Sequence, residues 1–104
     1  MRTDLIDRLN RTALAEFCRK HGVKRLASFG SVNRDDFTDA SDVDILVEFE
    51  PEATPDLYTM VYMADELSER FFDHRRVDIL TPDSLSRYFR DDVFNEARTL
   101  YVQA

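Results

Sequence analysis

The fold is decided by residues 23–49, which read VKRLASFGSVNRDDFTDASDVDILVEF. Residues 23–29 are short and partly apolar, and residues 43–49 alternate in polarity, so both segments are predicted to be β-strands. One face of the second strand is wholly apolar, which predicts that a helix packs against it. That face carries Val43, Ile45 and Val47, and the opposite face carries Asp42, Asp44, Leu46 and Glu48.

Two amphipathic helices flank these strands. The first is predicted from Leu5 to Cys18, where apolar residues recur at steps of three and four. The basic residues 19–21, followed by Gly22, are a stop signal for this helix. The second is predicted from Leu57 to Phe71, after a turn that contains two prolines. Its expected apolar stripe consists of Leu57, Met60, Val61, Ala64, Leu67 and Phe71.

A third strand and a last helix are predicted in the remaining chain. Residues 76–80 alternate in polarity and are expected to form the strand. Thr81 is a suitable N-cap for a helix that has Pro82 at its first position, where the missing N–H is no loss. The order of elements predicts an α+β, α/β-like fold in which a small mixed β-sheet is covered by helices.

Length and charge limit the classes of function. The 104 residues show no break in composition, so we expect a single domain over residues 1–104. A net charge of -7 disfavours a long nucleic acid as partner. The first residues include Asp4, and no run approaches the roughly 20 apolar residues that span a bilayer, so we expect a cytoplasmic protein without a membrane segment. Cys18 is the only cysteine and is expected to serve core packing.

Three aspartates are the candidate catalytic residues and metal ligands. Asp42 and Asp44 are two positions apart on one strand, about 6.6 Å between backbones, so their carboxylates can lean toward one point. Asp78 joins them if the third strand lies beside the second. Clustered carboxylates suit Mg²⁺, which retains part of its shell for water and substrate phosphate.

Gly30 and Ser31 follow the first strand and are candidate nucleotide-binding residues. Glycine lets the backbone approach a ligand closely, and the next N–H groups with the Ser31 hydroxyl suit phosphate oxygens. Ser31 can equally cap the following turn, since capping and phosphate binding use the same geometry. The combination Gly-Ser-x₁₀-Asp-x-Asp is more specific than either half alone.

These motifs resemble the minimal nucleotidyltransferase (MNT) family of the DNA polymerase β superfamily. The similarity covers roughly residues 20–80 and rests on FGSVNR at 29–34, SDVDILV at 41–47 and RVDIL at 76–80, with EARTLY at 96–101 similar to the family's C-terminal stretch. It implies a polymerase-β-type fold. It also implies an antitoxin that uses ATP to adenylylate a tyrosine of a HEPN toxin.

The resemblance also implies roles for individual residues. Gly30 and Ser31 would bind the ATP phosphates, and Asp42 and Asp44 would ligate Mg²⁺. The third carboxylate would lie near the attacking hydroxyl and help to remove its proton. Asp78 would be that carboxylate, and Arg34 would contact phosphate or pair with a carboxylate. Asp35 stands where many members of the family have glycine.

Other interpretations remain open from the sequence. The pair Asp42 and Asp44 can be a solvated edge, Asp78 can pair with Arg75 or Arg76, and Glu48 is expected to be a surface residue. Two alternative functions are a non-catalytic antitoxin that only binds its partner and an enzyme that nucleotidylates a small molecule. The other expectations are that His21 and His74 lie at the surface, that Met60, Tyr62 and Met63 pack within a helix, and that Tyr58 or Tyr62 contacts a partner or the adenine as the less favoured alternative.

Overall fold

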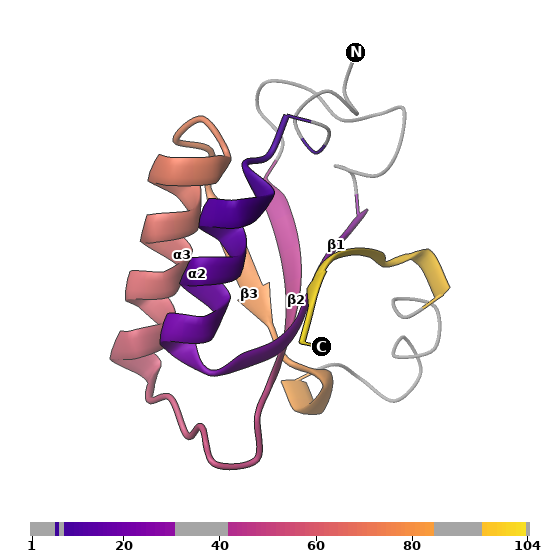
Figure 1. Ribbon diagram of the computed structural model, residues 1–104. Helices are drawn as coiled ribbons and strands as arrows, with labels where there is room; N and C mark the ends of the chain where they lie inside the picture. The colour runs from indigo at the N-terminus through magenta and orange to yellow at the C-terminus, as the bar shows by residue number, and fades with distance from the viewer. Residues whose placement is uncertain (1–5, 7, 31–41, 85–94, 104) are drawn as a thin grey trace.

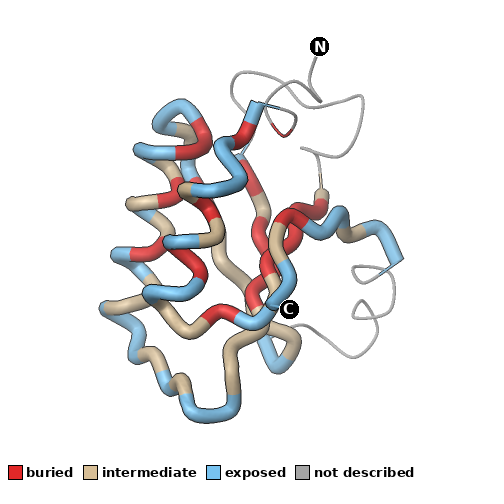
Figure 2. The backbone as a smooth tube through the Cα atoms, in the orientation of Figure 1, coloured by how far each residue is buried: buried red, intermediate tan, exposed pale blue. Residues whose placement is uncertain are grey.

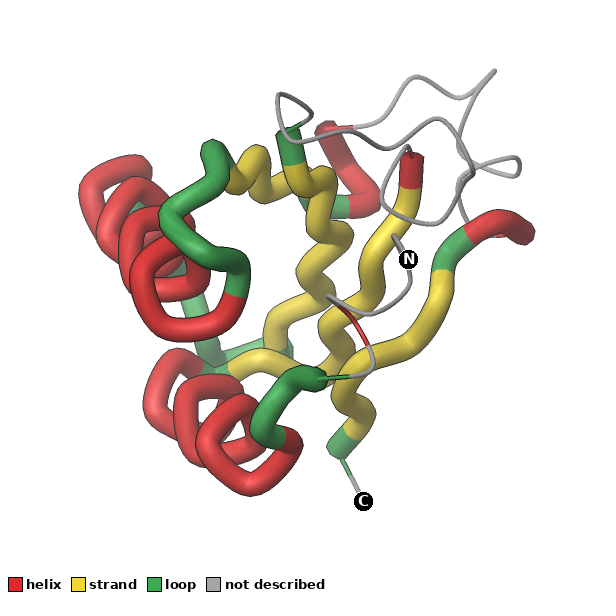
Figure 3. The backbone as a smooth tube through the Cα atoms, turned by 90° about the horizontal axis from the view of Figure 1, so that it is seen from above, coloured by secondary structure: helices red, strands yellow, loops and turns green. Residues whose placement is uncertain are grey.

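The computed structural model describes residues 6, 8–30, 42–84 and 95–103. Within them, a four-stranded sheet has helices α2 and α3 on one of its faces (Figures 1 and 3). This arrangement confirms the predicted α+β fold with a small mixed sheet. The elements in chain order are α2 (Arg11–His21), β1 (Val23–Phe29), β2 (Val43–Phe49), α3 (Leu57–Phe71), β3 (Val77–Leu80), the 3₁₀ turn η2 (Pro82–Ser84) and β4 (Arg98–Val102).

The strands are arranged in the order β3-β2-β1-β4. Strand β1 is antiparallel to both of its neighbours, β2 and β4. Strands β2 and β3 are parallel, because α3 carries the chain back along the sheet between them. The bounds of β1 and β2 are those that the sequence predicted, whereas β4 was not predicted.

The main core lies between the sheet and the two helices (Figure 2). Both helices and the alternate residues of β2 contribute buried side chains to it, as the pattern of β2 predicted. Cys18 belongs to this core, and burial raises the pKa of its thiol to about 12, which leaves it protonated and unreactive. The largest fully buried residues of the main core include Phe17, Leu14, Ile45, Met63 and Leu67. A smaller cluster on the opposite face of the sheet contains Ala27, Phe29 and Leu46, with Leu80 and Ala97 packed against it.

The predicted start of the first helix was wrong, whereas the predicted stop at residues 19–21 and Gly22 was confirmed. Helix α2 begins at Arg11, because the side chain of Asn10 accepts a hydrogen bond from the Ala13 N–H at 3.1 Å and caps the first turn. Leu9 precedes the helix, yet its side chain is buried in the core, so its apolar spacing did not reflect one continuous helix. At the other end, α2 runs to His21, and Gly22 with φ of 68° closes it.

Helix α3 has the predicted bounds but only part of the predicted buried face. Asp56 caps it by accepting a hydrogen bond from the Thr59 N–H at 2.8 Å, which also lowers the pKa of Asp56. Leu57 and Val61 were expected in the apolar stripe, but they are exposed. The spacing of the buried residues explains this: Met63, Leu67 and Phe71, four positions apart, face the core, which turns Leu57 and Val61 outward.

The described part of the chain after β3 also differs from the prediction. Pro82 begins a single 3₁₀ turn, in which the Ser84 hydroxyl donates to the Thr81 carbonyl at 2.8 Å and accepts from the Thr81 N–H at 3.0 Å. The Ser84 side chain therefore closes this turn, and the rest of the predicted helix falls in residues 85–94, outside the described residues. Neither described helix has the length and apolar character required to cross a membrane.

Candidate active site

Asp44 and Asp78 lie opposite each other on neighbouring parallel strands. They are direct register partners in the β2–β3 pair, and both are half-buried. Their flanking residues Ile45 and Val77 belong to the main core, so both carboxylates project from the opposite face of the sheet. The structure thus confirms that the third strand lies beside the second and brings two of the three predicted carboxylates together.

Gly30 directly follows β1 and packs against the carboxylate of Asp44. Phe29 is the register partner of Asp44, and Gly30 follows it with φ of 74°, a left-handed conformation. A Cβ added to Gly30 would stand 2.5 Å from Asp44 Oδ2, closer than non-bonded atoms approach. Only a residue without a side chain therefore leaves the Asp44 carboxylate in its place.

Asp42 directly precedes β2 and is exposed. Among the described residues, which include all three aspartates, no three His, Cys, Asp or Glu side chains gather closely enough to hold a metal ion. The structure therefore places Asp44 and Asp78 as a pair and does not join Asp42 to them. Ser31 and Arg34, the other predicted nucleotide-binding residues, lie outside the described residues.

Arg76 supplies a positive charge at the rim of the pair. Its Nε donates to Asp78 Oδ1 at 3.2 Å, so the pairing that the sequence left open for Asp78 is present. The Arg76 side chain is 75% exposed and that of Asp78 38% exposed, which makes this a weak, solvent-screened ion pair. Such a pair leaves Asp78 able to exchange Arg76 for another cation.

Glu48 shares the sheet face of the aspartates but has a structural role. Its Oε2 accepts a hydrogen bond from Arg25 Nη1 at 3.1 Å, and Arg25 also donates to the Thr99 hydroxyl on β4. This network ties β2, β1 and β4 together across the outer face. Glu48 is therefore partly exposed and lies outside the group of aspartates, as the sequence predicted.

The donors at the pair fit a hard divalent cation. Carboxylate oxygens are the ligands that Mg²⁺ prefers, and two protein carboxylates leave room for water and phosphate oxygens. The glycine beside Asp44 keeps the approach to that carboxylate clear of a side chain. Asp44 and Asp78 are therefore the residues that would hold such an ion, with Asp42 next to them in sequence.

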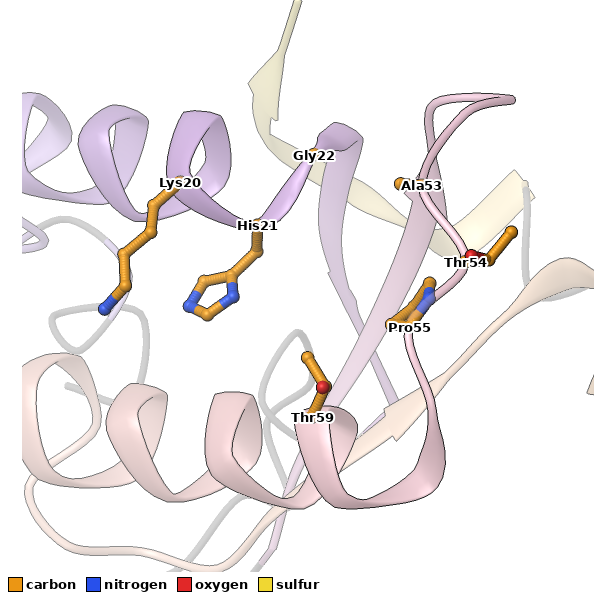
Figure 4. Close-up of a pocket in the computed structure, with 7 residues that line it drawn as sticks. All are labelled: Lys20, His21, Gly22, Ala53, Thr54, Pro55 and Thr59. Carbon is orange, nitrogen blue, oxygen red and sulfur yellow. The ribbon is translucent and has the colours of Figure 1, made fainter.

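A second polar hollow, of about 370 Å³, lies at the opposite end of β1, where α2 ends and α3 begins. Figure 4 shows Lys20 and His21 projecting from α2 toward α3. Glu66 of α3 contacts Lys20 Nζ and His21 Nε2, each at 3.5 Å. The His21 side chain is only 14% exposed, so the expectation that it lies at the surface was wrong. The cluster joins two helices and is remote from the aspartates.

Comparisons with known proteins show the family to which the chain belongs. The model of the nucleotidyltransferase domain family matches residues 11–100. A Methanocaldococcus jannaschii protein, provisionally named a protein adenylyltransferase, is 40% identical over 79 residues, which are 75% of this chain and 80% of that protein. A solved structure, provisionally described as a minimal nucleotidyltransferase, is 34% identical with a TM-score of 0.69 and covers 85% of this chain and 86% of its own.

A third similar structure contains an MNT antitoxin bound to a tri-AMPylated HEPN toxin of Shewanella oneidensis. It has a TM-score of 0.62 at 20% identity and covers 90% of this chain and 71% of its own, a likeness that shows the fold alone. The fold is the polymerase-β-type nucleotidyltransferase fold. The family match covers the strands that carry Gly30, Asp44 and Asp78. The chain therefore belongs to the nucleotidyltransferase domain family and is a nucleotidyltransferase.

Proposed function

We propose that this chain transfers AMP from ATP to a tyrosine hydroxyl of a partner HEPN toxin and thereby acts as its antitoxin in the cytoplasm. The proposal rests on the Asp44–Asp78 register pair, in which Gly30 packs against Asp44. The 40% identical Methanocaldococcus jannaschii relative, provisionally named a protein adenylyltransferase, supports a protein as the acceptor of AMP. The complex of an MNT antitoxin with an AMPylated HEPN toxin supports the toxin as that acceptor.

The acidic residues divide the chemistry between them. Asp44 and Asp78 would hold Mg²⁺, which when bound supplies positive charge to the attacking and leaving oxygens, and Asp42, exposed just before β2, is proposed to join them as a further ligand. Asp78 is partly exposed and can also accept the proton of the incoming hydroxyl. The tyrosine oxygen then forms a bond to the α-phosphorus of ATP. The bond from that phosphorus to the bridging oxygen breaks, and pyrophosphate leaves.

The nucleotide-binding residues position the phosphates for this in-line displacement. Gly30 has no side chain between the backbone and Asp44, so a phosphate group can approach both. Ser31 and Arg34 are proposed to contact the phosphates through a hydroxyl and a guanidinium, respectively. Most of the rate enhancement would then come from positioning and electrostatic stabilisation.

The test is incubation of the chain with Mg²⁺, ATP labelled at the α-phosphate and its candidate partner, the product of the neighbouring gene. We expect label on the partner and, by mass spectrometry, an added AMP on a tyrosine. Asp42→Asn and Asp44→Asn should remove the label. Asp73→Asn, a change of an exposed aspartate between α3 and β3, is the matched control and should transfer AMP like the wild type.

Inhibition of the toxin separates the proposal from its main alternative. If Asp44→Asn still silences the toxin fully while adding no AMP, the chain is an antitoxin that acts by binding alone. Label that appears on a small hydroxyl compound, but never on the partner, would instead assign a small-molecule nucleotidyltransferase. Either result contradicts the proposed protein substrate.

A further inference from the structure

Helix α3 exposes a stripe of apolar side chains on its outer side. Their exposed fractions range from 52% to 78%, although a helix of a small protein normally turns such residues toward the core. The four positions form two i, i+4 pairs, so the side chains adjoin one another along the helix. We call this stripe the α3 apolar face; it consists of Leu57, Tyr58, Val61 and Tyr62.

A hollow of about 470 Å³ lies beside the α3 apolar face. It is bounded by the end of β2, the loop before α3 and the turn η2. Met60 lines the hollow and lies three positions after Leu57, so the α3 apolar face adjoins the hollow at Leu57. The apolar residues that line it are Val47, Phe49, Pro51, Ala53, Pro55 and Met60.

The charges around this surface have one sign. The described residues that line the hollow include Glu48, Glu50 and Asp83 but no lysine or arginine. Glu48 is already paired with Arg25, so the negative charge of the rim comes mainly from Glu50 and Asp83. Farther along the outer side of α3, Asp65 and Glu69 add two more exposed carboxylates.

This charge pattern selects among possible occupants. A second copy of the chain would bring the same acidic groups and its own net charge of -7 against this surface, which is repulsive. A protein that presents apolar side chains flanked by lysine or arginine is complementary in both respects. Exposed tyrosines next to a hollow are typical of the residues that anchor protein interfaces.

We propose that the α3 apolar face and the adjoining hollow dock the acceptor protein through an apolar anchor flanked by basic side chains, an inference that rests on the proposed function. The hollow adjoins the last residues of β2, whereas Asp44 lies near its start. Figure 1 shows α3 beginning at the end of the sheet away from the start of β2. The docking surface is therefore separate from the residues that carry the chemistry.

The first test measures binding of the candidate partner, the product of the neighbouring gene, by isothermal titration calorimetry. The double variant Leu57→Ser/Tyr62→Ser should raise the Kd by about tenfold or more, because exposed apolar anchors dominate such interfaces. Val102→Ser, a change of an apolar side chain that is 60% exposed on β4, should bind like the wild type. All three proteins should unfold at similar temperatures, because the substituted residues are exposed.

The second test addresses the basic character of the partner. Asp83→Lys should weaken binding and reduce its dependence on salt, because it replaces an attraction that salt screens. Glu16→Lys, a change of an exposed acidic residue on α2, is the matched control and should retain the wild-type Kd and salt dependence. An Asp83→Lys variant with wild-type binding at every salt concentration would overturn the basic-partner assignment.

Measurement of AMP transfer in parallel separates the two proposals. Asp44→Asn should bind the partner normally and transfer no AMP. If Leu57→Ser/Tyr62→Ser binds like the wild type, or the wild type does not bind the partner, the docking inference is wrong. If the wild type binds through the α3 apolar face but transfers no AMP, the proposed function fails and the docking surface stands. A wild-type homodimer that this double variant dissociates would also overturn the inference.

Discussion

Gly30 and Asp44 are in contact across the β1–β2 pair, so that a Cβ at Gly30 would stand 2.5 Å from Asp44 Oδ2. Asp44 in turn is the register partner of Asp78 on β3. Three strands thus meet at one point: β1 contributes a residue without a side chain, and β2 and β3 contribute the carboxylates. The glycine is required there for two reasons, its φ of 74° and the position of Asp44.

Gly30→Ala should abolish nucleotidyl transfer. The added methyl group must displace the Asp44 carboxylate, and the left-handed backbone adds a cost of about 1–2 kcal/mol. The matched control is Gly22→Ala, because Gly22 has φ of 68° and its added Cβ would meet Ala53 Cβ at 2.9 Å, away from the site. We expect Gly22→Ala to lower the unfolding temperature but to keep the activity per folded molecule. Equal losses of activity in both variants would contradict the specific role of Gly30.

Arg76→Ala should reduce the Mg²⁺ concentration needed for half-maximal activity. Arg76 is the cation that pairs with Asp78 in this structure, and removal of it leaves the carboxylate free for another cation. The free energy of unfolding should change by less than about 1 kcal/mol, because the ion pair is exposed. Titration of activity with Mg²⁺ tests this, with Arg70→Ala on α3 as a control that leaves the concentration unchanged. A higher Mg²⁺ requirement in Arg76→Ala would show that Arg76 assists binding.

Glu66→Gln should destabilise the fold by about 1 kcal/mol near neutral pH. Partial burial raises the pKa of Glu66, but hydrogen bonds from Arg70 and His21 and the charge of Lys20 outweigh it, so the pKa lies below its ordinary value of 4.5. A lowered pKa in the folded state stabilises above the unfolded pKa, and this contribution is lost as the pH falls through the folded pKa. Urea unfolding should therefore show a wild-type advantage above pH 4.5. Below that pH the advantage should decline, and an advantage that grows there would contradict the assignment.

Leu67→Ala and Leu57→Ala should differ strongly in stability, although both are leucines on α3. Leu67 is fully buried, so truncation should cost about 2–5 kcal/mol through lost contacts and a cavity. Leu57 is 75% exposed, so the same change should alter the free energy of unfolding by less than about 0.5 kcal/mol. Chemical denaturation measures both values. Similar losses in the two variants would show that α3 packs in another register.

The strands were predictable where the local pattern carried the information. Short length and partial apolar character defined β1, and alternation defined β2, both with the observed bounds. The expectation that Asp78 joins Asp44 on one face depended on β3 lying beside β2, which the strand register confirms. Strand β4 was not predicted, because only Leu100 among its residues is buried and its pairing with β1 joins segments far apart in sequence. Pairing of that kind leaves no periodic signal in a short segment.

The error at the start of the first helix has a different physical origin. The start of α2 depends on one side chain, Asn10, that caps the backbone, whereas apolar spacing continues past it to Leu9. At the site, the spacing of two on a strand predicted that Asp42 and Asp44 converge on one ion, and this stays a prediction, since Asp42 is exposed and directly precedes β2. The strand register that places Asp78 opposite Asp44 depends on how β2 and β3 pair in the folded protein, so it could not be predicted from either segment alone.

Asp44 and Asp78 are proposed to hold the divalent ion together, and a measurement of Mn²⁺ binding tests this without any requirement for activity. Electron paramagnetic resonance can measure free Mn²⁺ in the presence of a non-hydrolysable ATP analogue for the wild type, Asp44→Asn, Asp78→Asn and the control Asp65→Asn. We expect each change in the pair to weaken Mn²⁺ binding by at least about tenfold and the control to leave it unchanged. Wild-type affinity in the Asp44→Asn/Asp78→Asn double variant would contradict the account.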